Sequence, residues 1–228
     1  MRKRPAASPR TRVRRHPERA DYDRTTIDAI LDEALICHIG FVVEGVPWVM
    51  PTMYARTGDI LYVHGSPVSR MLSAAAGGAD VCITVTLLDG LVLARSVFHH
   101  SMNYRSVVLV GRPQDVTETE EKMAAFKALV DHVIPGRWED SRQPTTKELK
   151  ATKVLRLDIR EALCKVRSGG PEDPSADAEL PIWAGVIPVT NQVGEPIPSL
   201  DLPPGVDLPA YVSHYRRPNG LQGTPSSD

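Results

Sequence analysis

Apolar residues recur at every second position along parts of the first half of the chain, and this pattern predicts short β-strands. The alternation covers residues 37–43, stops at Glu44-Gly45 and gives way to a β-rich run over residues 46–54. Two such runs separated by a two-residue turn are typical of a β-hairpin. A further turn at residues 57–59 and an apolar run at residues 60–63 extend this hairpin by another predicted strand.

A second hairpin is predicted further along the chain. Residues 81–88 alternate apolar side chains with cysteine and threonine, Asp89-Gly90 favours a type I′ turn, and residues 91–98 form the returning strand. Runs rich in β-branched residues at 104–110 and 154–159 add two more strands. Short strands joined by tight turns predict an antiparallel barrel or sandwich.

Helical periodicity interrupts the strands in four segments: 25–35, 66–76, 117–133 and 145–151. Two of them begin with the spacing of a capping box, Thr25 with Asp28 and Thr117 with Glu120. The second segment begins with Ser66 before Pro67, which predicts a capping residue and a proline at the first helical position.

Composition divides the chain into three parts. Residues 1–20 carry eight Lys or Arg against one acidic residue, and we expect a basic, flexible arm there. Eleven of the 20 prolines lie in the last 58 residues, which excludes a regular sheet or a long helix in that region. The apolar run 182–187 is the exception and is expected to dock on the barrel. We therefore predict one folded domain over residues 21–190 and a proline-rich extension over residues 191–228.

Composition also limits the class of protein. Hydrophobic residues make up 42% of the chain and charged residues 24%, which is typical of a globular protein. No apolar run is long enough for a transmembrane helix or a secretory signal, so we expect a cytoplasmic protein without a membrane partner. Three widely spaced cysteines predict reduced thiols. The basic arm could contact nucleic acid, but it has no aromatic residue for stacking and the rest of the chain is acidic, so we do not expect a nucleic-acid partner.

The segment from residue 61 to residue 70 has the pattern of an anion-binding turn. A predicted strand ends at His64, Gly65 permits a close backbone approach, and Ser69 and Arg70 fall at the start of the predicted helix. Backbone amides, a hydroxyl group and a guanidinium together suit a phosphate group. An ordinary capped helix with a surface arginine is the alternative, and the local pattern leaves both open.

Two further segments carry groups that could contact a ligand. His99 and His100 lie in a polar link, but neighbours in a strand face opposite ways and no partner residues have zinc spacing, so no metal site is predicted. This link could contact a polar heterocycle or could be a polar turn. In the segment 48–54, Pro51 cannot donate a ladder hydrogen bond and predicts a sheet edge or a bulge.

Taken together, these segments resemble the pyridoxamine 5′-phosphate oxidase-like family, the FMN-binding split β-barrel proteins. The branch that they resemble includes small flavin-nucleotide-binding proteins and nitroimidazole-resistance proteins. The shared order is the hairpin strand with residues 51–54, the segment 61–65, the Ser-Arg step at 69–70 and the strand 104–111. The resemblance covers residues 14–190 and implies a mainly β fold, an antiparallel split barrel with accessory helices.

The resemblance also implies a homodimer with FMN at the subunit interface. The residues that it implies for FMN binding are Pro51, Thr52, Met53, Tyr54, His64, Gly65, Ser69, Arg70, Arg105 and Ser106, with Trp183 from the other subunit. His99 and His100 are the candidates for contacting a substrate.

These features lead to the hypothesis of an FMN-dependent oxidoreductase acting on an unknown small molecule. The C-terminal Arg/His motif that grips pyridoxal phosphate is not recognisable, so oxidation of pyridoxamine phosphate is not expected. Two alternatives stay open. The same fold could bind haem, through His64, His99 or His100, or the deazaflavin F420. The chain could also be a non-enzymatic, flavin-binding regulator whose basic arm contacts nucleic acid, with strong salt dependence.

Overall fold

The computed structural model describes residue 6 and residues 8–216. Ten strands lie in the described residues: β1 (Ala20–Asp21), β2 (Ile36–Val43), β3 (Val46–Thr57), β4 (Ile60–Gly65), β5 (Val81–Leu93), β6 (Ser101–Gly111), β7 (Gln114–Asp115), β8 (Lys153–Asp158), β9 (Ala162–Arg167) and β10 (Gly185–Pro188). The helices are α1 (Arg24–Glu33), α2 (Arg70–Ala76), α3 (Thr119–Val133), α4 (Thr146–Ala151) and α5 (Ala210–Ser213), with 3-10 turns η1 (Pro9–Thr11), η2 (Pro17–Arg19), η3 (Val97–His99) and η4 (Ser175–Asp177).

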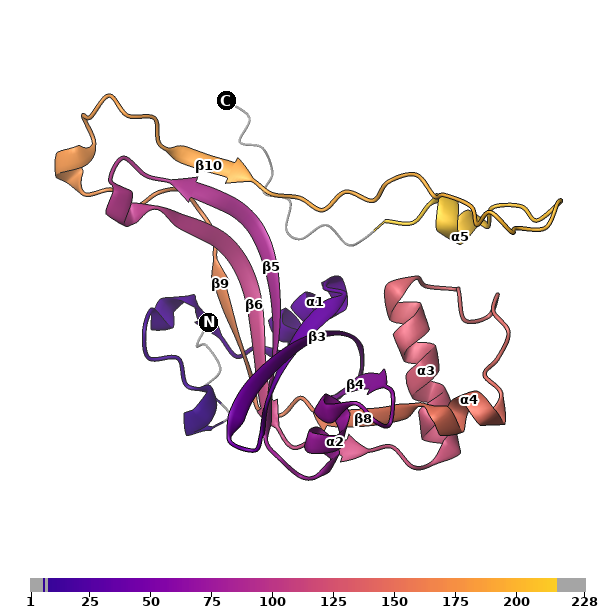
Figure 1. Ribbon diagram of the computed structural model, residues 1–228. Helices are drawn as coiled ribbons and strands as arrows, with labels where there is room; N and C mark the ends of the chain where they lie inside the picture. Colours follow the sequence, from indigo (N-terminus) through magenta and orange to yellow (C-terminus); the bar gives the residue numbers. More distant parts are fainter. Residues whose placement is uncertain (1–5, 7, 217–228) are drawn as a thin grey trace.

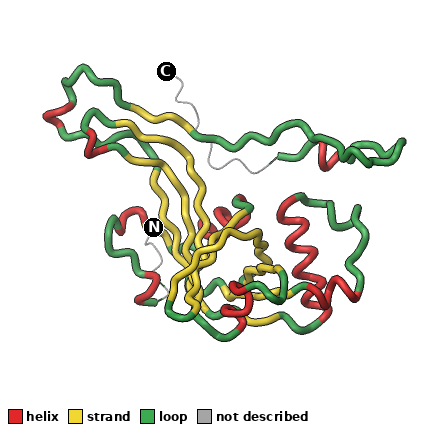
Figure 2. Tube along the Cα trace, in the orientation of Figure 1, coloured by secondary structure: helices red, strands yellow, loops and turns green. Residues whose placement is uncertain are grey.

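The strands form one antiparallel sheet that curls into an open barrel (Figures 1 and 2). Its order is β1-β9-β6-β5-β2-β3-β4-β8-β7, and β10 pairs with β5 off this path. The two ends of the path, β1 and β7, do not pair with each other among the described residues, so the barrel is split rather than closed. This architecture confirms the predicted mainly β, antiparallel split barrel.

The barrel interior is filled by apolar side chains from both halves of the sheet. Alternation along the strands directs Ile39 of β2, Val63 of β4, Ile83 of β5, Leu109 of β6 and Leu155 of β8 into one buried cluster. Two helices close the ends of this cluster. Ile27, Ile30 and Leu31 of α1 are buried, as the helical spacing predicted, and so are Met71 and Leu72 of α2.

Helix α3 packs outside the barrel against β3 and β4. A small second cluster joins Ala125 of α3 to Tyr62 of β4 and Val154 of β8. Hydrogen bonds add to this packing: Tyr62 donates to Glu121 over 3.1 Å, and His132 lies 2.7 Å from the Ala34 carbonyl oxygen. The packing fixes α3 beside the end of β4 that carries His64.

The hairpin predicted at Asp89-Gly90 is wrong. Strand β5 continues through this dipeptide to Leu93, with a bulge between Leu88 and Gly90, and its antiparallel neighbour is β6. Long-range contacts explain the difference. Strand β10 pairs beside Gly90, where a Cβ atom would lie 3.0 Å from Val186 Cγ1, and the Asp89 carboxylate accepts hydrogen bonds from Arg105.

Three predicted helix starts are also wrong. Asp23, not Thr25, caps α1, and its carboxylate accepts a hydrogen bond from the Thr25 backbone. Helix α2 begins at Arg70, three residues after the predicted start, and α3 begins at Thr119 after Glu118. Helix α4 begins with a capping box between Thr145 and Glu148, residues that are three positions apart in the sequence.

The N-terminal segment packs on the barrel where it is described. Arg10 pairs with Asp80 and Glu161, and Thr11 is buried. Positions 1–5 and 7 of the predicted flexible arm lie outside the described residues, so its flexibility stays a prediction.

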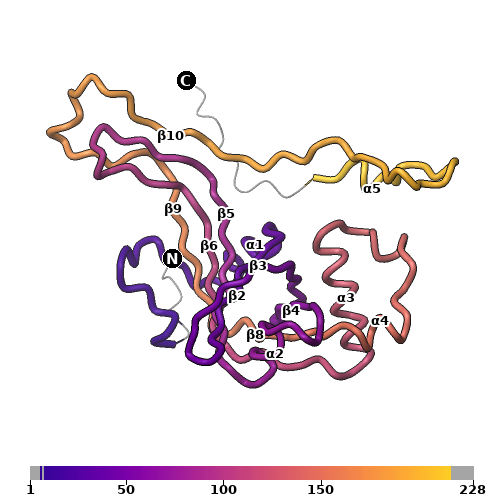
Figure 3. The backbone as a smooth tube through the Cα atoms, in the orientation of Figure 1, coloured from indigo at the N-terminus to yellow at the C-terminus, as the bar shows by residue number. Residues whose placement is uncertain are grey.

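Residues 189–209, here called the C-terminal arm, run from β10 to α5 without pairing with another strand among the described residues (Figure 3). Beyond this arm, α5 and the residues after it contact the end of α3 and the segment that follows α3. Tyr211 donates to Asp140 over 2.6 Å, and Tyr215 donates to the Val133 carbonyl over 2.6 Å. The run 182–187 was predicted to dock on the barrel. Its second half forms β10 and pairs with β5, but on the part of β5 that extends beyond the barrel, and Ile182 and Trp183 stay 48% and 65% exposed (Figure 1).

None of the helices in the described part of the chain has the length and apolar character required to cross a bilayer.

Candidate functional site

The turn between β4 and α2 collects four of the residues expected to hold a phosphate. Strand β4 ends at Gly65, and the Ser69 backbone donates to the Ser66 carbonyl over 3.0 Å, which closes a tight turn around Pro67. Ser69 occupies the N-cap position of α2, yet its hydroxyl group makes no capping hydrogen bond among the described residues. This hydroxyl group is therefore free to bind a ligand. Because α2 has only 7 residues, its dipole adds little, and the charge at the turn comes from Arg70.

Arg70 lies over the indole ring of Trp48. The guanidinium carbon is 5.1 Å from the ring centroid, which is cation–π geometry. Arg70 is exposed and forms no ion pair with any carboxylate that the structure describes. The arrangement leaves a positive charge without a counter-ion beside an aromatic plane.

His64 lies on β4 just before the turn, and its ring forms a T-shaped pair with that of Phe126 of α3 at a centroid distance of 6.2 Å. Its Nδ1 atom is buried and has no hydrogen-bond partner within the described chain. Burial lowers the pKa of His64 below its ordinary value of 6.5, so the ring is neutral at neutral pH. A buried nitrogen without a partner is rare in folded proteins and marks this histidine as a candidate ligand contact.

An exposed apolar strand runs beside the turn. Strand β4 pairs with β3 only from Tyr54 onward, so the preceding part of β3 has a free edge among the described strands. Pro51 lies in that part, as expected for a proline at a sheet edge. Trp48, Val49 and Met50 are 40–65% exposed on the same stretch. Because side chains alternate along a strand, Trp48 and Met50 share one face of β3 and Val49 lies on the other. Exposed apolar side chains of this kind suit a flat ring or a protein partner.

The four predicted hairpin residues differ in how accessible they are. Pro51 is exposed, and Thr52 and Met53 are half-buried. Tyr54 is fully buried, its hydroxyl group donates to the Leu31 carbonyl over 2.6 Å, and its ring lies 5.1 Å from that of His132. In this chain Tyr54 therefore ties β3 to α1, and a flavin contact by Tyr54 stays a prediction.

Arg105 and Ser106 lie on β6, away from the turn. Arg105 donates to both carboxylate oxygens of Glu33 on α1 and of Asp89 on β5. The Glu33 hydrogen bond, followed by the Asp89 one, raises the pKa of Arg105. Ser106 lies 3.4 Å from the Lys165 carbonyl oxygen. Arg105 therefore links three elements of the fold, and cofactor contacts by either residue stay predictions.

The remaining predicted residues lie at the far tip of the β5–β6 extension (Figure 1). His99 ends η3, and its ring lies 5.3 Å from that of Phe98. His100 Nδ1 lies 3.0 Å from the Ser96 carbonyl oxygen. Trp183, 65% exposed, precedes β10. Within a single chain, these three residues therefore lie away from the phosphate turn.

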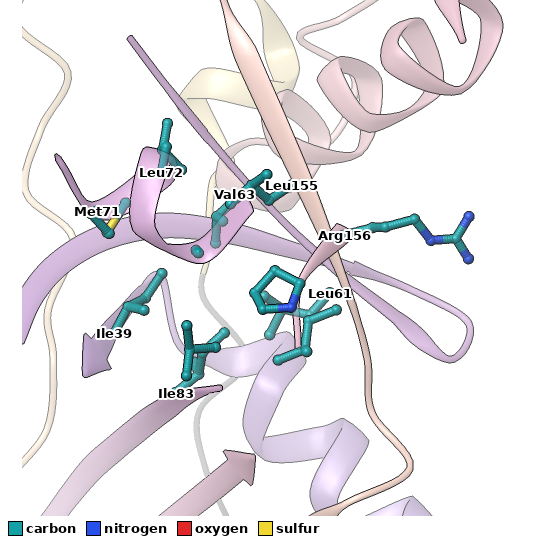
Figure 4. Close-up of a pocket in the computed structure, with 12 residues that line it drawn as sticks. Ile39, Leu61, Val63, Met71, Leu72, Ile83, Leu155 and Arg156 are labelled. Carbon is teal, nitrogen blue, oxygen red and sulfur yellow. The ribbon is translucent and has the colours of Figure 1, made fainter. Parts of the chain in front are cut away.

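The interior of the barrel cannot hold a flavin. The cavity there has a volume of about 10 Å³ and is lined by apolar side chains of the core, while Arg156 at its rim points away from it (Figure 4). That volume is about the minimum for a single water molecule. A flavin bound by this chain therefore lies outside this cavity.

All three cysteines are free thiols, and burial raises the pKa of Cys37 to about 12, which keeps it protonated and unreactive. No cluster of three or more metal-ligating side chains occurs within the described residues.

Two parts of the site were not predicted from the sequence. Trp48 lies in the segment 48–54 but is not among the predicted cofactor-binding residues, although an exposed tryptophan in a hairpin strand is a signal of a contact surface. An open cavity beside Pro67, lined by Lys122, Lys150 and Lys153, draws its residues from α3, α4 and β8. No local pattern could have joined these lysines.

The open antiparallel barrel, with an arginine-bearing turn beside an exposed apolar strand, places this protein among the split β-barrel proteins. The chain belongs to the pyridoxamine 5′-phosphate oxidase family, whose model matches residues 23–166, more than half of its length.

Solved structures support this family assignment. The chain is similar to the flavocytochrome Anf3 from Azotobacter vinelandii, with 44% identity, a TM-score of 0.88 and coverage of 92% of this chain and 98% of that one. It is similar to a FAD and heme binding protein from Mycobacterium smegmatis, with 38% identity, a TM-score of 0.82 and coverage of 85% and 95%. A putative 5-nitroimidazole antibiotic resistance protein from Bacteroides thetaiotaomicron is 25% identical, with a TM-score of 0.55 and coverage of 64% and 86%. No curated protein gives a significant match.

Proposed function

We propose that this protein binds a flavin nucleotide at the turn between β4 and α2 and acts as a flavin-dependent oxidoreductase on a small molecule. The observation that carries the proposal is the position of Arg70 over Trp48, 5.1 Å from the ring centroid. It supports the proposal because a cation without an ion pair among the described residues, suited to a phosphate, lies beside an aromatic side chain that a flavin ring could contact. The matches to a flavocytochrome and to a FAD and heme binding protein favour the same chemistry.

The residues at the turn fit a phosphorylated flavin. Arg70 supplies charge, and the free hydroxyl group of Ser69 supplies a hydrogen bond. Gly65 lets α2 pack closely against β4, because a Cβ atom there would lie 3.0 Å from Leu72 Cδ1. A bound flavin supplies the redox chemistry, while the protein positions the ring and tunes its surroundings. Trp48 and Met50, on one face of β3, would exclude water from one side of a ring placed against them.

We also propose a homodimer with the cofactor at its interface. The wall of β3 exposes large apolar residues, and the C-terminal arm exposes Ile197, Leu200 and Val206. Exposed apolar surface of this extent favours association with a second copy. The far-tip residues Trp183 and His100 could reach the turn only if another copy supplied them. Light scattering of the wild type and of Val49→Glu tests this: the wild type is expected to be a dimer and the variant a monomer with weakened flavin binding.

Haem is the second cofactor that we propose, and His100 is its candidate axial ligand. The contact of Nδ1 with the Ser96 carbonyl oxygen leaves Nε2 available, which is the arrangement that metal-ligating histidines commonly have. The residues beside it, Val97 and Phe98, are about 90% exposed and apolar, as a haem face requires. One of the two more similar structures is named as a FAD and heme binding protein, and the other is named as a flavocytochrome.

Absorbance spectroscopy and mass spectrometry of the purified protein test the proposed function. We expect flavin bands together with a Soret band. The variant His100→Ala should lose the Soret band and keep the flavin, while His16→Ala, an exposed histidine beside Glu18, should keep both. A protein that retains neither flavin nor haem after reconstitution contradicts the proposal, and one that retains only F420 replaces its flavin part.

A further inference from the structure

The part of the sheet that projects beyond the barrel, here called the extension, has one covered face and one exposed face. It consists of the end of β5, the start of β6 and the whole of β10 (Figure 1). On the covered face Val92 is only 1% exposed, and the side-chain amide of Asn103 donates to the Gly169 carbonyl over 3.0 Å. The linker between β9 and β10 therefore contacts this face.

Three apolar side chains form a row across the other face of the extension, here called the exposed face. Leu91 of β5 is the register partner of Met102 on β6 and of Ile187 on β10. Directly paired residues of antiparallel strands point to the same side of a sheet, so the row spans all three strands. Its members are 38–54% exposed. An apolar row that crosses a sheet and stays exposed indicates a contact surface.

An indole ring lies next to this row. Gly185 lies two residues before Ile187 on β10 and therefore faces the same side. A Cβ atom on Gly185 would lie 2.8 Å from two ring atoms of Trp183, so the indole packs over the glycine, and most of it stays accessible. The exposed face thus combines an aromatic plane with aliphatic side chains. Surfaces of this kind bind extended, proline-rich segments.

The C-terminal arm has the composition that such a surface binds. Ile197 lies between Pro196 and Pro198, and Leu200 follows shortly after them. Ile197 is 92% exposed and Leu200 is fully exposed, so neither side chain packs on its own chain. Prolines hold a segment extended before it binds, which lowers the entropy cost of docking.

The arm does not reach the exposed face of its own chain. At its start, the Val189 backbone donates to the Asp89 carbonyl over 3.1 Å. Beyond its end, Tyr211 and Tyr215 form hydrogen bonds at and after the end of α3. Between these anchors residues 190–208 are all exposed and run away from the extension (Figure 3). An apolar segment fixed at both ends in this way favours a partner molecule, and a second copy of this chain offers a matching face.

We propose that the arm of one copy docks on the exposed face of the extension of a second copy, with Ile197 against the apolar row. The inference rests on the homodimer proposed above and assigns it a contact surface outside the flavin site. In a two-fold dimer the contact forms twice, because each copy offers both an arm and a face. A stable interface takes roughly 20–30 residues from each partner, and the arm and the exposed face together supply a segment of this size.

Disulfide trapping in the full-length protein tests the proposal. Met102→Cys and Ile197→Cys are combined in one chain, the protein is oxidised with diamide, and the products are separated on a non-reducing gel. We expect a covalent dimer. The wild type, with its three native cysteines, gives the background. Ala124→Cys combined with Ile197→Cys is the control and should stay monomeric, because Ala124 is an exposed residue of α3 outside the extension. A disulfide within one chain means that the arm folds onto its own extension and overturns the proposal.

Sedimentation of arm variants gives a second measure that does not depend on a disulfide. Ile197→Asp should raise the dissociation constant of the dimer by at least about tenfold, because a large apolar side chain is no longer buried between the copies. Gln192→Asp is the matched control, since it adds the same charge at an exposed polar residue of the arm, and it should leave the constant unchanged.

The outcomes separate this inference from the proposed function. If Ile197→Asp and Gln192→Asp both dimerise as the wild type does, the exposed face serves another partner and the inference is overturned, while the homodimer stands. A monomeric wild type overturns the proposed homodimer together with this inference. The absorbance of bound flavin, recorded on the same samples, tests the flavin site independently of both.

Discussion

The guanidinium group of Arg70 lies 5.1 Å from the ring centroid of Trp48 and joins the start of α2 to the free part of β3. A cation–π contact at an exposed site contributes only about 0.5–1 kcal/mol. It therefore holds the arginine in place weakly, and a phosphate can recruit the guanidinium without breaking an ion pair. The pair connects the proposed phosphate site with the proposed ring site.

Replacing Arg70 by alanine should reduce flavin affinity by about 1.5–3 kcal/mol, the contribution of a hydrogen bond to a charged group. Stability should change little, because the side chain is exposed. Fluorescence titration with flavin measures the affinity. Arg112→Ala is the control, since Arg112 is an exposed arginine paired with Asp80 away from the turn. If Arg70→Ala and Arg112→Ala bind flavin equally well, the phosphate site is not at this turn.

Replacing Tyr54 by phenylalanine should destabilise the fold by about 1–3 kcal/mol, because the change leaves the buried Leu31 carbonyl without its donor. Flavin affinity should stay unchanged, since the ring of Tyr54 is fully buried. Urea unfolding and flavin titration of the same samples separate the two effects. A loss of affinity without a loss of stability would instead support the predicted flavin contact.

Replacing Arg105 by methionine should destabilise the protein by about 3 kcal/mol or more, because the carboxylates of Glu33 and Asp89 lose their shared cation. Glu33 is only 15% exposed, so solvent screens its charge poorly. The double variant with Glu33→Gln should recover part of this loss, because it removes one part-buried carboxylate charge that Arg105 no longer compensates. Chemical unfolding measures both. A single variant as stable as the wild type would mean that Arg105 is not a structural link.

Local sequence predicts a turn correctly only where no distant segment intervenes. Glu44 and Gly45 adopt positive φ angles of 51° and 78° and form the predicted hairpin turn between β2 and β3. Asp89-Gly90 has the same kind of sequence, yet β10 pairs beside Gly90 and Arg105 binds Asp89. These partners are far away in the sequence, and their contacts stabilise a bulge in place of a turn.

The candidate site likewise has one part that local sequence predicts and one part that depends on distant segments. His64, Gly65, Ser69 and Arg70 lie within seven consecutive positions of the chain, so their local pattern is sufficient to predict the turn. The lysine-lined cavity could not be predicted, because its residues meet only when α3, α4 and β8 pack beside that turn. Side chains gathered from distant elements leave no periodic signal along the chain.

The last prediction concerns the pH dependence of stability that His64 introduces. Burial lowers its folded-state pKa below the unfolded value of 6.5, and no charged group contributes to the shift. Between these two pKa values the unfolded state binds more protons than the folded state, so stability falls as the pH decreases through this window. Above the window both states are neutral at His64 and the dependence disappears.

His64→Gln removes this contribution while leaving the other titrating groups in place. We measure the free energy of unfolding of wild type and variant by urea unfolding from about pH 7.5 to about pH 5. As the pH falls, this free energy should decrease more for the wild type than for the variant. Saturating flavin should reduce this shift, because a phosphate near His64 favours the protonated ring. A difference that is independent of pH would show that His64 titrates as an exposed histidine does. If flavin does not change this pH-dependent difference, His64 does not contact the cofactor, and Arg70 and Ser69 are the residues that hold the phosphate.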